Sequence, residues 1–403
     1  MAAAPSYDVL ASVHEQASRD AALAALRRED PIQWDPDHQW WLLTRHADIR
    51  EVSRNPQIFS SEPKGPWHVA EHRFSMQSMD GKVHLRHRNV VSRAFTPRMV
   101  SMLSERAVRY ADEAIDALEG RNQGEFVTDL AVPVPMRIIA DMLGVADGDL
   151  GRFREWTDAV INGTNLDGEG DNLQQAAPLI GELLEYVGRT AEARRAEPRD
   201  DILSKIVQAA EEGLLSDKPE GMDPDASFST DEVKDMALFL LMAGNETTRN
   251  GISQGMLALF QHPEERARLA AHPELWDTAA DEILRWTTPV RAMRRTALCD
   301  TELRGQKIRE GESVVMVYAS ANRDEEVFDE PHRFKVDRTP NEHLSLGFGP
   351  HYCLGANLAK MEIKAALGRI LARLPDLRLA PGAEPEFMPS ALIDGISSMQ
   401  VEW

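Results

Sequence analysis

One cysteine stands in a glycine-rich segment of the chain. Cys353 lies within Leu344–Ala359 (LSLGFGPHYCLGANLA), and a helical pattern of apolar residues continues from there to Leu374. A cysteine at the N terminus of a helix lies near free backbone N–H groups and the positive end of the helix dipole, which favour the thiolate. Such a thiolate can be a nucleophile or a metal ligand, and a buried thiol can also be inert. Zinc is disfavoured because the only other cysteine is Cys299 and no set of cysteines and histidines has zinc-ligand spacing, whereas haem iron takes just one thiolate from a protein.

An acid and an alcohol occur in the middle of a long apolar helix. Ser229–Glu232 (STDE) has the spacing of a capping box. Apolar residues then run without proline over Val233–Phe260, a helix of roughly 42 Å. A glycine (Gly244) and a carboxylate (Glu246) are both unfavourable in the centre of a buried helix. The segment Ala243–Thr248 (AGNETT) therefore indicates a functional site.

Two other enzyme classes can be compared with these patterns. The long helix contains Gly251–Gly255 (GISQG), which matches the G-x-S-x-G of hydrolases. A nucleophile elbow needs a strand before the serine, and here both flanks are helical, so we expect no nucleophile at Ser253. An all-helical terpene cyclase would need a cluster of carboxylates for magnesium. The only Asp pair, Asp200–Asp201, lacks a third acid at helical spacing.

The predicted fold is mainly α-helical with small β-sheets, because apolar residues spaced three and four apart dominate the chain. The predicted helices, besides the long one, are Ala21–Glu29, Val100–Glu119, Pro133–Leu143, Ala176–Ala193 and Asp201–Gln208, and the predicted strands are Trp40–Thr44, Val314–Tyr318 and short pieces between Arg294 and Ile308. Gly163–Asn172 and Glu211–Ser227 are rich in turn-forming residues and predict surface loops. There is no internal repeat and no long linker, so we expect residues 1–403 to form one domain.

The composition narrows the possible partners. The 403 residues include 45 Lys and Arg against 66 Asp and Glu, a net charge of −21. This balance argues against nucleic acid or an anionic membrane as the main partner, because both need a basic surface. No signal-peptide pattern is visible, and the longest apolar stretch, Met236–Gly244, is far shorter than a membrane span. With two cysteines only, we expect a cytoplasmic protein with no membrane span.

Taken together, the motifs resemble the cytochrome P450 family along nearly the whole chain. They are the haem-loop signature (Gly349, His351, Cys353, Gly355), the oxygen-activating helix motif (Ala243, Gly244, Glu246, Thr247), the Glu-x-x-Arg motif with its later arginine (Glu282, Arg285, Arg333), the haem-facing helix (His84, Arg88) and a propionate-binding arginine (Arg295). Each motif alone is weak, but five in the family's order and spacing are specific. Two departures affect the surroundings of the sulfur and the rigidity of a loop: Leu346 stands where phenylalanine is usual, and Asp80–Val83 (DGKV) where Asp-Pro-Pro is usual.

The resemblance implies a P450 fold that holds haem b (iron protoporphyrin IX) between the long central helix and the cysteine loop. Cys353 would be the iron ligand, while Thr247 would hydrogen-bond dioxygen and Glu246 would relay protons to it. The Glu282, Arg285 and Arg333 side chains would form a buried ionic cluster that holds the fold. The cofactor-binding residues would be His84, Arg88, Ala243, Gly244, Arg295, Leu346, Gly347, Phe348, His351 and Gly355.

The resemblance is closest to bacterial enzymes that hydroxylate sterol side chains or methyl-branched lipids at a terminal carbon. It rests on Ala243–Asn250, Trp286–Thr296, Ala319–Phe328 and Asp394–Trp403. Terpene-alcohol hydroxylases share much of Ser320–Phe328, so a smaller terpenoid or a secondary metabolite is the alternative substrate. The expected pocket lining is apolar and suits a hydrophobic substrate. It consists of Leu240, Val290, Met293 and Ile393, with Ala243 and Thr247.

Such a monooxygenase uses O2 and needs electrons from another protein. The chain has no flavin or iron–sulfur motif, which implies a ferredoxin with its reductase. Basic residues near Cys353 are expected to form a landing surface for an acidic ferredoxin. These are Lys360, Lys364, Arg369 and Arg373, with Arg88 and Arg93 beside them. A haem enzyme driven by hydrogen peroxide would be expected to lack the Glu246–Thr247 pair.

Overall fold

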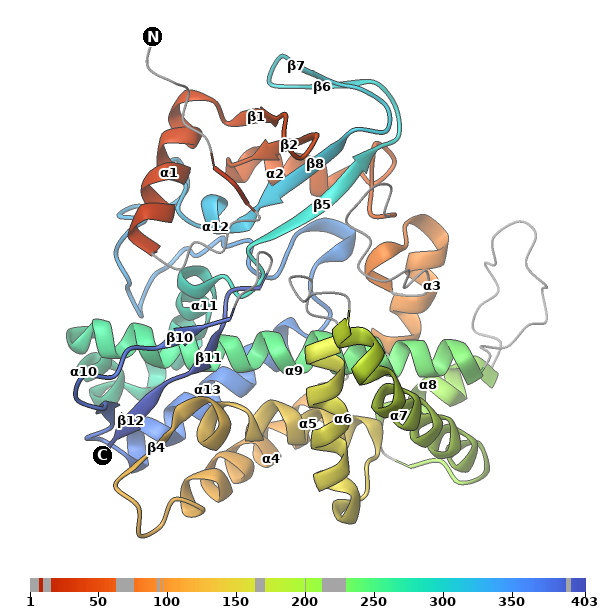
Figure 1. The fold of residues 1–403 in the computed structure, drawn as a ribbon, viewed down its shortest axis with the longest axis vertical. Coiled ribbons are helices and arrows are strands. Elements are labelled where there is room, and N and C mark those ends of the chain that lie inside the picture. The colour runs from red at the N-terminus through yellow and green to blue at the C-terminus, as the bar shows by residue number, and fades with distance from the viewer. Residues whose placement is uncertain are drawn as a thin grey trace.

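The computed structural model describes residues 7–9, 16–62, 76–92, 95, 97–163, 171–199, 201–211, 230–388 and 393–403. The long helices α4, α5 and α6 lie on one side of α9, and the larger sheet lies on the other (Figure 1). The helices are α1 (Gln16–Glu29), α2 (His46–Arg54), α3 (Gly81–Ser92), α4 (Pro97–Asp116), α5 (Pro133–Leu143), α6 (Leu150–Gly163), α7 (Asp171–Ala196), α8 (Ile202–Glu211), α9 (Thr230–Gln261), α10 (Pro263–Ala271), α11 (Trp276–Thr287), α12 (Tyr318–Ala321) and α13 (Ala356–Arg373). Short helical turns are η1 (Met76–Ser78), η2 (Val127–Ala131), η3 (Asp147–Asp149), η4 (Pro273–Leu275) and η5 (Gly349–His351).

The strands are short and form several small sheets. They are β1 (Ile32–Asp35), β2 (Trp40–Leu43), β3 (Phe59–Ser60), β4 (Gln123–Glu125), β5 (Ala292–Ala297), β6 (Thr301–Leu303), β7 (Gln306–Ile308), β8 (Ser313–Val317), β9 (Arg378–Leu379), β10 (Glu386–Phe387), β11 (Ile396–Ser398) and β12 (Gln400–Glu402). The largest sheet has the order β1-β2-β8-β5-β3, in which β2 and β8 run parallel and the other pairs antiparallel. The smaller sheets are β4-β12-β9, β10-β11 and β6-β7.

Strand β8 is buried on both faces. Successive side chains of a strand point to opposite faces, so its alternating apolar residues serve two cores. Val314 and Met316 pack in a cluster with Ile49 and Val52 of α2, whereas Val315 and Val317 pack in another with the leucines of α1. The sheet thereby joins α1 and α2 to the rest of the fold.

Helix α9 crosses the width of the molecule (Figure 1) and is 32 residues long. Three of its glycines face isoleucines of other helices. A Cβ atom would lie 2.9 Å from Ile139 of α5 at Gly244, 3.0 Å from Ile363 of α13 at Gly251, and 2.8 Å from Ile283 of α11 at Gly255. The missing side chains thus let α9 approach three neighbouring helices closely.

The predicted fold class is confirmed, and the predicted elements correspond to observed ones. Pro133–Leu143 coincides with α5, and the other predicted helices and strands differ from the observed ones at their ends. The capping serine Ser229, residues 164–170 and residues 212–229 lie outside the described residues. None of the helices in the described part of the chain combines the length and apolar character that a membrane crossing requires.

Candidate active site

The segment before Cys353 is a tight loop whose shape depends on two glycines. Gly347 and Gly349 each have a φ of 71°, a left-handed conformation that residues with a side chain rarely adopt. A Cβ atom at Gly349 would lie 2.5 Å from the carbonyl oxygen of Ser53 in α2. The N–H of Cys353 donates a hydrogen bond to the carbonyl of Leu346 at 2.8 Å. The loop is thus closed by its own backbone and packed tightly against α2.

Two apolar residues of this loop have separate packing roles. The ring of Phe348 contacts two guanidinium groups of α2: Cζ of Arg50 lies 4.4 Å and Cζ of Arg54 lies 4.8 Å from the ring centroid. These are cation–π distances, so the ring anchors the loop to α2. The side chain of Leu346 is buried in the main hydrophobic core. That Phe348 and Leu346 contact a cofactor stays a prediction.

The Cys353 thiol lies at the start of a helix, as the sequence predicts. Gly355 is the N-cap of α13. Burial raises the pKa of Cys353, while the N–H of Gly355 and the guanidinium of Arg88 act in the opposite direction. A cation or metal at the sulfur would add to these two groups and favour the thiolate further.

A cluster of basic side chains lies beside the loop. The ring of His84 from α3 stacks on that of His351, with centroids 4.1 Å apart. Arg88 donates to the carbonyl of Tyr352 at 2.7 Å. Burial, with the positive charges of His351 and Arg88, lowers the pKa of His84 to about 4. Three predicted cofactor-binding residues, His84, Arg88 and His351, are therefore brought together from two distant segments.

Asp80 holds this cluster in place. It accepts hydrogen bonds from the hydroxyl of Ser60 and the N–H of Ser61, both at 2.6 Å, and its other oxygen lies 3.3 Å from Nε2 of His351. Burial alone would raise the pKa of Asp80, but its hydrogen bonds, that of His351 first, hold the pKa well below its usual range. The loop that departs from the family pattern therefore still supplies the carboxylate that orients His351.

Arg295, on β5, provides the test of whether an anionic cofactor fits. Its side chain is partly buried, and burial lowers the pKa of the guanidinium. Within the described part of the chain, this guanidinium donates one hydrogen bond, to the carbonyl of Arg294 at 2.7 Å. Among the described residues, no carboxylate forms an ion pair with Arg295 or Arg88. A buried guanidinium is stable when an anion compensates it. The residues present thus fit a group that carries its own carboxylates, as haem does.

The centre of α9 has the surface expected of a site. Ala243 is exposed although it lies in the middle of this long helix, and Thr247 follows one turn later. The hydroxyl of Thr247 donates to the carbonyl of Ala243 at 2.6 Å. Gly244 faces α5 instead, so its small size serves helix packing, and contact of Ala243 or Gly244 with a cofactor stays a prediction.

Glu246 is a partly buried acid on the same helix. Burial raises the pKa of Glu246, which the charge of Arg249 opposes. The nearest atoms of the two side chains, Glu246 Oε1 and Arg249 Nη2, are 3.5 Å apart. A carboxyl group can hold and release a proton, which is what a proton relay requires. By contrast, Ser253 is fully buried and donates to the carbonyl of Asn250, which confirms that no hydrolase nucleophile is present there.

Two of the expected pocket residues lie side by side. Val290 and Ile393 form an isolated antiparallel β-bridge, although they are far apart in the sequence. Leu240 is buried in the main core on α9, and Met293 on β5 packs beside the core of the sheet. All four are apolar and at least partly buried, but their contact with a substrate stays a prediction.

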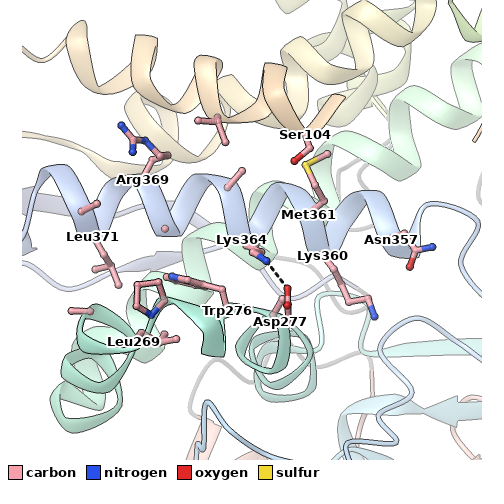
Figure 2. A pocket seen from close by; sticks show the side chains of 17 residues that line it. Ser104, Leu269, Trp276, Asp277, Asn357, Lys360, Met361, Lys364, Arg369 and Leu371 are labelled. Atoms are coloured by element: carbon pink, nitrogen blue, oxygen red, sulfur yellow. Dashed lines mark hydrogen bonds and ion pairs between the residues drawn. The ribbon is translucent and has the colours of Figure 1, made fainter. Parts of the chain in front are cut away.

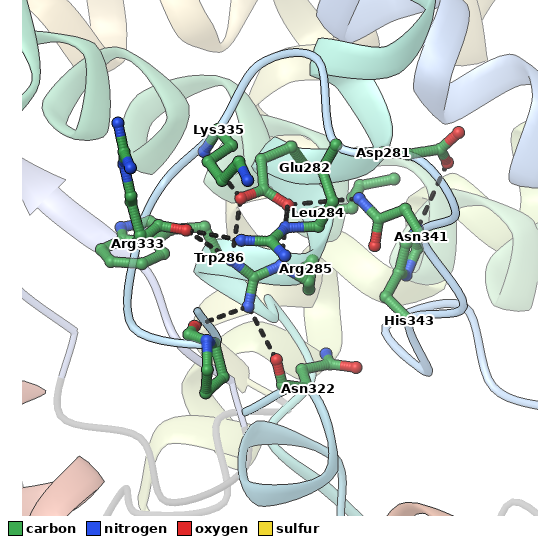
Figure 3. A network of polar contacts seen from close by, with 12 residues as sticks. Asp281, Glu282, Leu284, Arg285, Trp286, Asn322, Arg333, Lys335, Asn341 and His343 are labelled. Carbon is green, nitrogen blue, oxygen red and sulfur yellow. Dashed lines mark hydrogen bonds and ion pairs between the residues drawn. The ribbon is translucent and has the colours of Figure 1, made fainter. Parts of the chain in front are cut away.

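The predicted ionic cluster forms, but its second cation is a different arginine. Figure 3 shows Arg285 beside Glu282. Arg285 donates to both carboxylate oxygens of Glu282, at 2.7 and 2.8 Å. The second cation is Arg338, whose Nε donates to Glu282 at 3.0 Å. The side chain of Arg333 is 61% exposed and pairs with Glu330, and only its carbonyl oxygen joins the cluster. The assignment of Arg333 was therefore wrong, because the chain turns so that Arg338 reaches the buried carboxylate.

The predicted basic surface is largely neutralised by ion pairs. Lys360 pairs with Asp281 at 3.2 Å and Lys364 with Asp277 at 2.5 Å (Figure 2), while Arg369 and Arg373 both pair with Asp112. These pairs border a groove of about 860 Å³ between α4, α10, α11 and α13 whose floor includes Trp276 and Met361. The four predicted basic residues of α13 therefore do not form a free cationic patch, because acidic residues of other elements pair with them. Arg93 lies outside the described residues.

Three features are the arrangement of a haem-thiolate protein. They are a partly buried cysteine at a helix N terminus, two arginines beside the loop with no carboxylate ion pair among the described residues, next to histidines of which His351 contacts Asp80, and an exposed small residue in the middle of a crossing helix. Comparisons with known proteins define the family. The sequence profile of the family described as Cytochrome P450 matches residues 270–397.

Curated relatives and solved structures cover almost the whole chain. A steroid C26-monooxygenase of Mycolicibacterium smegmatis is 37% identical over 402 residues, which are 94% of this chain and 90% of the relative. A methyl-branched lipid omega-hydroxylase of Mycobacterium bovis is 38% identical over 407 residues, 96% and 91% of the two chains. The crystal structure of CYP109E1 from Bacillus megaterium in complex with testosterone has a TM-score of 0.83 and 32% identity, covering 95% of this chain and 98% of that one. A Mycobacterium marinum cytochrome P450 in complex with pseudoionone has a TM-score of 0.84 and 34% identity, covering 96% and 95%.

The chain belongs to the cytochrome P450 family, and it is a monooxygenase of that family. The family's cofactor is a haem iron. The alternative of a terpene cyclase is thereby excluded.

Proposed function

We propose that the chain binds haem b through Cys353 and hydroxylates a sterol side chain or a methyl-branched lipid. When bound, haem supplies the iron at which dioxygen is activated. The Cys353 sulfur would be its protein ligand, and His84, Arg88, Arg295 and His351 would pair with its propionates by charge-assisted hydrogen bonds. The observation that carries the cofactor proposal is the partly buried Arg295, whose guanidinium forms no ion pair with a carboxylate among the described residues.

The proton supply is assigned to two residues of α9. Hydroxylation inserts one oxygen atom of O2 into a C–H bond and releases the other as water, which consumes two protons and two electrons. Glu246 would be the carboxyl group that relays protons; burial raises its pKa, and the charge of Arg249 opposes this shift. The hydroxyl of Thr247, next in the chain, would pass protons toward the exposed surface at Ala243 after it releases the Ala243 carbonyl.

The substrate class rests on the relatives and on the apolar character of the expected lining. The curated relatives described above are named as a steroid C26-monooxygenase and a methyl-branched lipid omega-hydroxylase. Each of them aligns with more than 90% of this chain. The lining residues Leu240, Val290, Met293 and Ile393 offer no charge to bind a polar head group, which favours an apolar substrate. The structural neighbour with pseudoionone supports a smaller terpenoid as the second candidate.

Product analysis separates the candidates. The purified enzyme is supplied with a surrogate ferredoxin, its reductase and NADH, and incubated with a cholestane-type sterol, a methyl-branched fatty acid or pseudoionone. Testosterone, which lacks the sterol side chain, is the matched control for the first substrate. We expect terminal hydroxylation of the sterol or the branched acid and none of it with testosterone. Oxidation of pseudoionone alone would overturn the proposal in favour of the terpenoid.

We assign electron delivery to a separate ferredoxin that contacts the surface over Cys353. With the lysines of α13 paired, this surface presents two exposed apolar side chains, Leu85 (50% exposed) and Tyr352 (41%). They flank Arg88, which lies one turn after Leu85 on α3 and donates to the Tyr352 carbonyl. An apolar contact beside a cation suits the acidic surface of a small iron–sulfur protein.

A charge introduced at this surface tests the assignment. Tyr352→Glu would place an anion next to Cys353 and should slow reduction by the ferredoxin by on the order of tenfold while substrate binding is unchanged. Val327→Glu is the matched control, because Val327 is also an exposed apolar residue (37%) but lies in another part of the chain. Equal reduction rates for both variants would show that the ferredoxin contacts another surface.

A further inference from the structure

Asp394 joins two arginines from distant parts of the chain in a buried ion triad. Its Oδ2 lies 2.6 Å from Nη1 of Arg19 on α1, and its Oδ1 lies 3.2 Å from Nη2 of Arg291. The three side chains are at most 7% exposed. The triad is distinct from the Glu282 cluster and from the basic residues beside Cys353.

The triad connects the two segments that carry a pair of expected pocket residues. Arg291 directly follows Val290, and Asp394 directly follows Ile393. Val290 and Ile393 form a β-bridge, and the N–H of Asp394 donates to the carbonyl of Pro289 at 2.8 Å. The backbone bridge and the ion pair between Arg291 and Asp394 therefore join the same two segments, the first through main-chain atoms and the second through side chains.

The turn at Asp394 is also fixed against α9. The amide of Gln254 donates to the carbonyl of Asp394 at 2.6 Å. A Cβ atom at Gly395 would lie 2.6 Å from the side chain of Asn250, which is completely buried. Ile393 therefore has little freedom to move relative to α9, the helix that carries Ala243 and Thr247.

The two arginines depend strongly on this one carboxylate. In the described part of the chain, Asp394 is the one acid within ion-pair distance of Arg291, and Nε and Nη1 of Arg291 have no hydrogen-bond partner. The second acid near Arg19 is Asp20, at 3.9 Å. Removing the charge of Asp394 would leave Arg291 buried without an anion, and its segment would have to shift toward water or another acceptor.

We propose that Asp394 and Arg291 are positioning residues that fix Val290 and Ile393 in the pocket wall and thereby determine which carbon of the substrate is oxidised. This inference rests on the proposed function, because it takes Val290 and Ile393 as substrate contacts. A displacement of the wall by a fraction of an ångström changes which C–H bond lies within reach, and misplacement of about 1 Å can change a rate by roughly a hundredfold.

The test compares Asp394→Asn with a matched control elsewhere. Arg194 of α7 and Asp201, the residue before α8, form an ion pair with the same distance, 2.6 Å, and nearly the same burial. Asp201→Asn should therefore destabilise the holoenzyme to a similar degree. For each variant we would measure the melting temperature, the ratio of hydroxylated products from the cholestane-type sterol, and the ratio of dissociation constants for imidazole and 4-phenylimidazole from the shift of the haem absorption band.

We expect both variants to lower the melting temperature, but only Asp394→Asn to change the product ratio and the azole ratio, each by roughly tenfold. Arg291→Lys keeps a cation at the triad and is the second variant to measure if Asp394→Asn does not retain haem. It should change both ratios in the same direction as Asp394→Asn. Equal ratios in the Asp394, Arg291 and Asp201 variants would overturn the inference. If the wild type hydroxylates none of the probes, the proposed substrate is wrong, and the azole ratio still decides the inference because it needs no turnover.

Discussion

The hydroxyl of Thr247 donates a hydrogen bond to the carbonyl of Ala243, one turn earlier on α9, at 2.6 Å. In this arrangement the Thr247 oxygen can still accept a hydrogen bond from another group. The exposed Ala243 lies one turn away. The hydroxyl must leave the carbonyl before it can donate to another group. Side-chain hydroxyls that bond to the carbonyl four residues before them also tend to bend a helix.

Thr247→Ala should uncouple electron consumption from hydroxylation. Without the hydroxyl, protons are no longer directed at the site, and reduced oxygen should leave as hydrogen peroxide. We expect product formed per NADH to fall by about tenfold or more while NADH is still consumed. Thr247→Ser keeps the hydroxyl and should retain most of the coupling. Equal coupling in the alanine variant and the wild type would show that Glu246 and water suffice.

Cys353→Ser should remove the thiolate ligand. A serine hydroxyl is a harder and far less acidic donor than a thiol, so it is a poor ligand for haem iron. The absorption band of the reduced, carbon monoxide-treated protein should shift away from that of the wild type, and hydroxylation should be lost. Cys299→Ser, at the exposed second cysteine, should change neither. Hydroxylation by the Cys353 variant would contradict the ligand assignment.

Arg338→Ala should destabilise the fold much more than Arg333→Ala. Arg338 is 5% exposed and bonds to Glu282, which is completely buried. Losing one partner of a buried charge pair costs about 3–5 kcal/mol of unfolding free energy. The Arg333 pair with Glu330 is largely exposed, and such pairs contribute little to stability because water screens them. Denaturant titration of both holoenzyme variants measures the difference; the reverse order would contradict the observed cluster.

Gly349→Ala should impair the cysteine loop beyond the cost of backbone strain. Gly349 has φ 71° and is also pressed against the Ser53 carbonyl, whereas Gly382 has φ 77° and no atom within 4 Å of the place that a Cβ atom would take. Gly382→Ala thus measures strain alone, on the order of 1–2 kcal/mol. We expect the Gly349 variant to lose more stability than this and to retain less haem after purification. Similar stability and haem content in both variants would mean that the contact with α2 is easily relieved.

Glu362→Gln should change how stability depends on pH. Burial raises the pKa of Glu362 on α13 well above its ordinary value of 4.5, and its Oε2 has no hydrogen-bond partner among the described residues. Above pH 4.5 the unfolded chain releases this proton, while the folded protein keeps it up to its raised pKa. The free energy of unfolding therefore falls as the pH rises from 4.5 to the raised pKa. The glutamine variant lacks this loss. Its melting temperature should exceed that of the wild type at about pH 8 and approach it at about pH 5.

The control for this prediction is Glu282→Gln. Its carboxylate is compensated by Arg285 and Arg338, so removing the charge should lower the melting temperature at about pH 8. A parallel pH dependence of the wild type and the Glu362 variant would show that Glu362 is ionised in the folded protein.

Local sequence patterns predicted the helices and strands well, but they predicted poorly which side chains from distant segments pair with one another. The helix Pro133–Leu143 and the cysteine loop follow from apolar spacing and glycines, which are properties of neighbouring residues. The choice between Arg333 and Arg338 depends on how the chain turns between α12 and the cysteine loop, and no spacing encodes it. The lysines of α13 were expected to be free because their acidic partners, such as Asp281, come from other helices. The cytoplasmic location and the single domain stay predictions.

The close packing of α9 has a consequence for changing what the enzyme accepts. Gly244, Gly251 and Gly255 bring this helix against isoleucines of three other helices, so it cannot slide along its axis without steric overlap. On the proposal that Val290 and Ile393 line the pocket, adaptation to substrates of different shape would then come from substitutions at these two residues, which form a β-bridge. A directed-evolution library should accordingly vary Val290 and Ile393 and leave the three glycines of α9 unchanged. A larger residue at any of these glycines would destabilise the helix packing without changing the shape of the pocket.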